Sequence, residues 1–229
     1  RDSNYLKHIG GDGNDHDFRD YKFLDYSSSI KYLSSKAIYS IRMGRKAEKF
    51  KLIKKFSSFY DFSNKKSNDF IDIFLINNCE FLVSSATGLS NMATLLRKKM
   101  VLVNAIPFWL REMYQYTPGS IFLPKKIFSI KKNRLLKFFE IENLDYNIHE
   151  KNFFKKRNLK VVNNSKEEIY LAVKEMFENY KKKNSKKYLS NLHNKFWNTI
   201  DDKRAVNIIR NKLQLNIADS FLKKNKSLI

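Results

Sequence analysis

The sequence has 229 residues, of which 42% are hydrophobic and 14% aromatic, so the chain can form a sizeable core and does not have the composition of a disordered protein. No run of about 18 apolar residues occurs, which predicts no membrane-spanning helix. The single cysteine, Cys79, excludes an internal disulfide and a cysteine metal cluster, and fits a reducing, cytoplasmic setting.

The charge is strongly positive: 45 Lys and Arg stand against 23 Asp and Glu, a formal net charge of +22. One explanation is a polyanionic partner, such as nucleic acid, anionic lipid or a phosphorylated substrate. The other is composition bias, because only ten of the cations are Arg and Asn and Ile are abundant. Specific nucleic-acid recognition relies on the planar fork of Arg, so we favour bias, while a peripheral contact with an anionic inner membrane stays compatible.

The chain opens on RDSNYLKH without Met, and we expect a strand and further sequence to precede it. Residues 1–22 are polar and rich in Gly and Asp, which predicts a long loop. Helical spacing of apolar residues predicts a helix over 23–37, and the β-branched run 38–44 predicts a strand that ends at Gly44. A basic helix or loop over 45–55 follows.

Further along, FSSFYDF (56–62) predicts a weak strand, and Ser67 is the expected N-cap of a helix over 68–79. The later expected elements are strands at 80–85, 100–104, 121–124 and 159–162, a helix at 88–99, and a basic helical segment at 127–140.

Ser165 and Glu168 have the spacing of a capping box that opens one more helix. One face of this helix should be apolar, formed by Ile169, Ala172, Val173, Met176, Phe177 and Tyr180. Helical segments are expected from about 185 to 226.

Strands that alternate with helices predict an α/β fold: a Rossmann-like parallel sheet of about six strands, covered by helices on both faces. We expect this Rossmann-like domain to cover residues 1–184. A C-terminal helical segment at 185–229 should pack on it or cross to a domain that precedes the sequence.

The stretch SSATGLS (84–90) is the most informative, because it lies between a predicted buried strand and a predicted helix. Ligands of open parallel sheets bind at the carboxyl ends of the strands, and a helix N-terminus favours anions. The hydroxyls of Ser84, Ser85, Thr87 and Ser90 would add donors. A purely local explanation stays open, in which Thr87 or Ser85 is the N-cap and Gly88 makes a tight turn.

Other polar residues fall at the same predicted edge. Arg42 closes the strand that ends at Gly44, and pairs either with a diphosphate or with a neighbouring Asp. In the loop HDFRD (16–20), His16 is either a general base, beside Arg19 and Asp20, or a loop cap.

The remaining histidines carry less information, and His193 on an amphipathic helix is expected to be structural. The sequence lacks the H-E-x-x-H, Walker and G-x-S-x-G motifs, so we expect no tight metal site, no cofactor and no serine hydrolase. The Lys pairs and the KKK run at 181–183 are expected to be solvated faces.

The order of these motifs resembles bacterial glycosyltransferases of surface-polysaccharide gene clusters. The likeness rests on HDFRD, a strand that ends in RMG, DI-x-LI-x-NC, FLVSS-x-x-GLS, a strand that ends in LVN, and the last residues, IADSFLKKNKSLI. RDSNYLK is similar to the end of the family motif H-x-R-D-S-x-Y-L. More distantly, residues 79–104 are similar to the donor-binding half of GT-B enzymes, including heptosyltransferases and O-fucosyltransferases.

The resemblance implies a metal-independent transferase that moves a sugar from a nucleotide-sugar to a polysaccharide or lipopolysaccharide acceptor at the inner membrane. Ser84, Ser85, Gly88, Leu89 and Ser90 match the diphosphate-binding turn, and Thr87 lies within it. Ala86-Thr87 departs from the Ser-Gly or Ser-Ser that is more usual in the family. The other matches are Arg42 and Gly44 at a strand end, Arg1 and Asp2 in a first loop, and His16, Arg19 and Asp20 in an HD-x-R motif; Asn104 is a further cleft residue.

Two alternatives remain. A nucleotide-sugar epimerase on the same scaffold would carry paired carboxylates and a His, and no clear pair stands out. A basic nucleic-acid-binding module would carry Arg and aromatic residues interleaved on one face, and that pattern is missing.

Overall fold

The computed structural model describes residues 22–45, 47, 56–63, 65, 68–106, 116–144, 152–181, 191–200 and 216–229. In chain order its elements are η2 (Phe23–Tyr26), α2 (Ser27–Ser35), β1 (Ser40–Arg42), β2 (Phe59–Asp61), α3 (Asp69–Asn78), β3 (Leu82–Ser84), α4 (Gly88–Leu95), β4 (Met100–Ala105), β5 (Ile121–Pro124), β6 (Lys126–Ser129), β7 (Arg134–Leu135), α5 (Phe138–Glu142), α6 (Phe153–Lys156), β8 (Leu159–Val162), α7 (Lys166–Lys181), α8 (Asn191–Asn198), β9 (Asn216–Ile217), α10 (Asp219–Lys224) and η5 (Lys226–Leu228).

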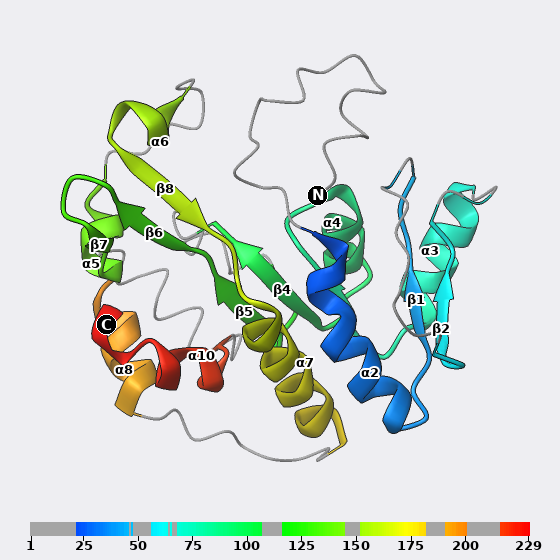
Figure 1. Ribbon diagram of the computed structural model, residues 1–229. Coiled ribbons are helices and arrows are strands. Elements are labelled where there is room, and N and C mark those ends of the chain that lie inside the picture. The colour runs from blue at the N-terminus through cyan, green and yellow to red at the C-terminus, as the bar shows by residue number, and fades with distance from the viewer. Residues whose placement is uncertain are drawn as a thin grey trace.

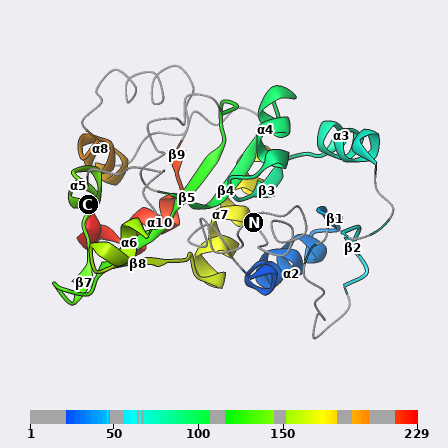
Figure 2. The same cartoon turned by 90° about the horizontal axis from the view of Figure 1, so that it is seen from above.

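A parallel sheet lies at the centre of the molecule (Figure 1). Within the described residues it has four strands in the order β3-β4-β5-β9, and each neighbouring pair is parallel. Helices α2 and α7 lie on one face of this sheet and α4 on the other (Figures 1 and 2). Every residue of β4 and β5 is buried, as expected for strands covered on both faces. The prediction of an α/β fold with a parallel sheet between helices is confirmed.

Within the described residues the sheet is smaller than predicted, because two groups of strands stand apart from it. Strands β1 and β2 form their own parallel pair. Strand β8 was expected in the parallel sheet, but it runs antiparallel to β6, which pairs on its other side with β7. A single residue, Lys125, separates β5 from β6, so the chain passes directly from one sheet into the next.

The predicted basic helix over 127–140 is wrong. Residues 126–135 form the β6–β7 hairpin, and only the short α5 that follows is helical. The turn of the hairpin holds Asn133 at φ 49°, a left-handed conformation that Asn tolerates better than most residues. The lysines of this stretch favour helix, but the alternating burial of β6 and the Asn turn decide the outcome.

Helix caps are partly as predicted. Asn68, and not Ser67, caps α3, since its side chain accepts a hydrogen bond from the N–H of Ile71 at 2.9 Å. The capping box of α7 is confirmed: the Ser165 N–H donates to Glu168 Oε2 at 2.7 Å, and the Glu168 N–H donates to Ser165 Oγ at 3.2 Å.

The apolar face of α7 is buried as expected, except at its last predicted member, Tyr180, which is exposed. This face packs on α2 and on the central strands, where it forms part of a continuous core. Tyr32 of α2 makes edge-to-face ring contacts with Tyr170 and Phe177 of α7.

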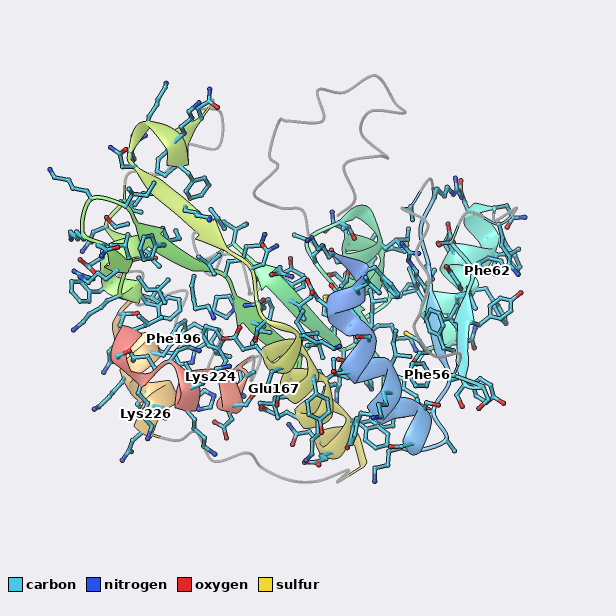
Figure 3. All side chains as sticks on the ribbon, in the orientation of Figure 1. Phe56, Phe62, Glu167, Phe196, Lys224 and Lys226 are labelled. Carbon is cyan, nitrogen blue, oxygen red and sulfur yellow. The ribbon has the colours of Figure 1, made fainter. Side chains whose placement is uncertain are left out.

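The C-terminal residues extend this core. The predicted tail was entirely helical, but β9 adds a strand beside β5, with Ile121 opposite Asn216. Helix α10 packs on α7 and α8. The ring centre of Phe196 in α8, labelled in Figure 3, lies 5.0 Å from the ring centre of Phe138 in α5.

No helix in the part of the chain that the structure describes is both long and apolar enough to cross a bilayer.

Candidate functional site

The serine-rich turn lies where the sequence predicted it, between the carboxyl end of β3 and the N-terminus of α4. Ser84, Ser85 and Ser90 are buried. Ser84 Oγ donates to the Ser85 carbonyl at 2.8 Å, and Ser90 Oγ donates to the Thr87 carbonyl at 2.6 Å. Because each hydroxyl has one proton, these two side chains spend their donors inside the turn.

Thr87 is the N-cap residue of α4, with an extended backbone. Its N–H donates to Ser90 Oγ at 2.9 Å, which ties the two ends of the turn together. The local explanation therefore accounts for the hydroxyls of Ser84 and Ser90.

The backbone N–H groups of the next two residues, unlike these hydroxyls, are not used within the turn. Those of Gly88 and Leu89 are the first two of α4, and the described residues provide no hydrogen-bond partner for either. Such orphan N–H groups and the helix dipole favour an anion at this end. The side chain of Leu89 packs against the core, so only its backbone can meet a ligand.

The backbone of Gly88 does not require glycine, because its φ is not in the left-handed region. It is exposed, and a Cβ built on it would meet no atom within 4 Å. The backbone of this helix start is thus open to close approach.

Asn104 lies on the adjacent strand, β4, two residues beyond the residue that pairs with Ser84. It sits in an irregular part of the ladder with β5, at φ 52°, and is only 3% exposed. Adjacent strands are about 5 Å apart, so its backbone lies at the same carboxyl edge of the sheet as the serine-rich turn. Its Oδ1 accepts from the N–H of Asn164 at 2.8 Å.

The amide nitrogen of Asn104 is buried and has no hydrogen-bond partner among the described residues. The assignment of oxygen and nitrogen is fixed by Asn164, whose backbone N–H must face an acceptor. An unsatisfied buried donor costs about 1 to 3 kcal/mol, so a ligand oxygen here would relieve a penalty.

Asn164 and Lys125 were not singled out in the sequence. Asn164 Nδ2 donates to the Pro124 carbonyl at 2.8 Å, so it joins the ends of β4 and β5 to the start of α7. Lys125 follows β5 directly and is fully buried. The expectation that Lys pairs are solvated faces is therefore wrong at 125–126. No sequence signal identified either residue, since their burial depends on the turn from β5 into β6.

Arg42 lies on β1, in the two-stranded sheet, and not on the sheet that carries Ser84 and Asn104. Its Nη1 is 3.3 Å from Asp61 Oδ2, and its guanidinium carbon is 4.2 Å from the centre of the Phe23 ring. Of the two partners predicted for Arg42, a diphosphate or a neighbouring Asp, the structure thus shows the Asp. Gly44 has φ 133°, a conformation essentially limited to glycine, so the backbone itself requires it.

The other predicted site residues, Arg1, Asp2, His16, Arg19 and Asp20, lie outside the described residues.

Among the residues that are described, no group of three or more His, Cys, Asp or Glu side chains is placed to hold a metal ion. Cys79 precedes β3, at the opposite end of the strand from the turn, and burial raises the pKa of its thiol. Comparisons with protein-family models, with curated proteins and with solved structures gave no significant match to this chain.

Proposed function

We propose that this chain is the nucleotide-sugar-binding part of a metal-independent glycosyltransferase of the GT-B type, and that the acceptor is a surface polysaccharide or lipopolysaccharide. The observation that carries the proposal is a pair of unsatisfied donor groups at the carboxyl ends of the neighbouring strands β3 and β4. These are the N–H groups of Gly88 and Leu89 and the buried amide nitrogen of Asn104.

A diphosphate suits these donors. Its oxygens are charged acceptors, the helix N-terminus supplies positive potential, and Gly88 leaves room for a phosphate against the backbone. In the transfer, the acceptor hydroxyl forms the new bond to the anomeric carbon, and the bond from that carbon to the diphosphate breaks. The diphosphate leaves with the electron pair, and donors placed around its oxygens stabilise the charge that develops.

The proton of the acceptor hydroxyl needs a base. His16 remains the candidate from the sequence, with Arg19 and Asp20 beside it. Arg42, held by Asp61 and Phe23, would contribute to a donor site only by exchanging its partner, so we assign it no direct contact.

The test is calorimetric titration of the 229-residue chain with UDP, GDP, CMP and ADP. We expect one nucleoside diphosphate to bind selectively, and Gly88→Val to weaken its binding about tenfold or more, the equivalent of one charge-assisted hydrogen bond. Asn91→Val is the matched control, because it places the same side chain on an exposed position of the same helix, near its start. Absence of binding by all four nucleotides, or equal losses in both variants, would contradict the proposal.

A further inference from the structure

The lobe formed by β6, β7, β8, α5 and α6 projects at one end of the molecule, at the upper left of Figure 1. We call its described residues, 126–144 and 152–162, the basic lobe. They include nine Lys and Arg and two Glu, whereas the rest of the described chain, about four times as long, has seventeen Lys and Arg and ten Asp and Glu. The residues between, 145–151, add one Lys, one Asp and one Glu. Within the described residues the positive charge is thus concentrated in this lobe.

The cations converge on one end of the three-stranded sheet. The register of β6 and β8 places Ser129 opposite Leu159, and the N–H of Ile130 donates to the Asn158 carbonyl at 2.8 Å. The β6–β7 turn is therefore beside the α6–β8 turn. Side chains that end in nitrogen project from both turns in Figure 3. The exposed cations of this end, which we call the tip, are Lys131, Lys132, Arg134, Lys155, Lys156 and Arg157.

An apolar side chain stands among these cations: Ile130 is 58% exposed. The turn that carries it is fixed on both sides. The Lys132 N–H donates to Ser129 Oγ at 3.2 Å. Glu140 receives two hydrogen bonds from Arg134, at 2.8 and 2.9 Å, and one from Lys132 at 2.6 Å. Ile130 is thus held outward by structure and not by a loose loop.

The two arginines of the tip are already engaged within the lobe. Arg134 uses its fork on Glu140, and the guanidinium of Arg157 lies 4.0 Å from the centre of the Phe153 ring. Recognition of nucleic acid relies on such forks and on exposed rings for stacking. What the tip offers instead is ammonium groups around an aliphatic side chain.

We propose that the tip of the basic lobe is a docking surface for an anionic lipid bilayer. Ammonium groups lie at the level of the headgroups and are attracted by their charge, while Ile130 enters the boundary of the acyl chains. This proposal does not depend on the proposed enzymatic function.

The test is co-sedimentation with phosphatidylcholine vesicles made with and without phosphatidylglycerol. The 229-residue chain should bind the anionic vesicles and not the neutral ones. The triple variant Lys131→Glu, Lys155→Glu, Lys156→Glu should lower the partition coefficient about a hundredfold or more, since each basic residue near the surface contributes about fivefold.

The control triple variant, Lys31→Glu, Lys36→Glu, Lys65→Glu, changes the net charge equally, at exposed lysines in α2, at its C-cap and after β2. It should retain most of the binding. Ile130→Ser should weaken binding several-fold, whereas Leu95→Ser, at an exposed position of α4, should not. Equal losses in the two triple variants, equal binding to neutral vesicles, or binding of RNA in place of vesicles would overturn the proposal.

Discussion

Asn104 combines three features at a single residue: a left-handed backbone, a side-chain oxygen bonded to the N–H of Asn164, and a buried nitrogen without a described partner. Asparagine is one of the few residues that adopt this backbone readily. Its side-chain oxygen accepts a hydrogen bond within the protein, and its side-chain nitrogen is left to donate to a ligand. The oxygen thus serves the fold, whereas the nitrogen has no partner among the described residues.

Asn104→Asp separates the role of the oxygen from that of the nitrogen, because aspartate keeps the acceptor and tolerates the left-handed backbone. Its second oxygen replaces the unused donor and would repel a diphosphate. We expect binding of the preferred nucleoside diphosphate to weaken tenfold or more, and binding of the corresponding nucleoside, which lacks phosphates, to change little. Calorimetry with both ligands measures this, and circular dichroism checks the fold. Equal losses for the two ligands would point to a structural role alone.

At the scale of elements, Glu168 joins three of them. Its carboxylate closes the capping box of α7, is 2.6 Å from Lys126 Nζ of β6, and accepts from Asn225 Nδ2, after α10, at 3.4 Å. Burial raises the pKa of Glu168, but the hydrogen bonds from Lys126 and Ser165 and the charge of Lys126 outweigh burial, and the pKa is lowered. The ionised form is therefore the one that stabilises the fold.

Glu168→Gln should lower the free energy of unfolding by about 2 to 4 kcal/mol at pH 7, since it leaves Lys126 without its buried partner. The pKa of Glu168 in the folded protein lies below its value in the unfolded chain. Its contribution to stability is therefore complete above about pH 4.5, and it is lost as the pH falls through the folded pKa. Urea unfolding at pH 7 and in the acid range should show the difference from wild type shrink on acidification.

Glu167→Gln is the control for that measurement. Glu167, labelled in Figure 3, is the adjacent residue of the same helix turn and is exposed. Its substitution should change stability by less than about 0.5 kcal/mol at either pH. A pH dependence of equal size in both variants would rule out the contacts of Glu168 with Lys126, Ser165 and Asn225 as its source.

Elements with a strong local signal could be predicted from the sequence. The apolar runs MVLV of β4 and IFLP of β5, the Ser165–Glu168 spacing and the strand–turn–helix around Ser84 each have one dominant local cause. The β6–β7 hairpin could not be predicted, because Lys and Leu favour helix and only Asn133 marks the turn. The site follows the same rule. The turn and Asn104 belong to predicted strand ends, whereas Asn164 and Lys125 reach that edge through the passage between two sheets.

At the scale of the whole molecule, the C-terminal residues are part of the main core. Ile217, Phe221 and Leu222 are essentially fully buried, against strands and helices from earlier in the chain. His193 of α8 is also buried, with Nε2 3.0 Å from the Ile217 carbonyl and Nδ1 3.3 Å from Asp219 Oδ1. We therefore expect the described parts to unfold together.

Phe221→Ala should lower the stability of the whole chain by about 3 to 5 kcal/mol, because it opens a cavity in this core. Urea transitions followed by Trp fluorescence and by far-UV circular dichroism should shift together in the variant. Phe139→Ala, at a position that is 47% exposed, should cost much less. A separate early transition in only one signal would show that the C-terminal residues form an independent unit.

The pairing of β5 with β9 has a consequence for biosynthesis. As the nascent chain leaves the ribosome, β5 emerges long before the residues that pair with it, and until then it presents an apolar strand with an open edge. The described sheet can be completed only after β9 has been synthesised, and the pairing of strands so far apart in the sequence is intrinsically slow. Expression at low temperature, or with a chaperone that shields strand edges, should therefore raise the soluble yield.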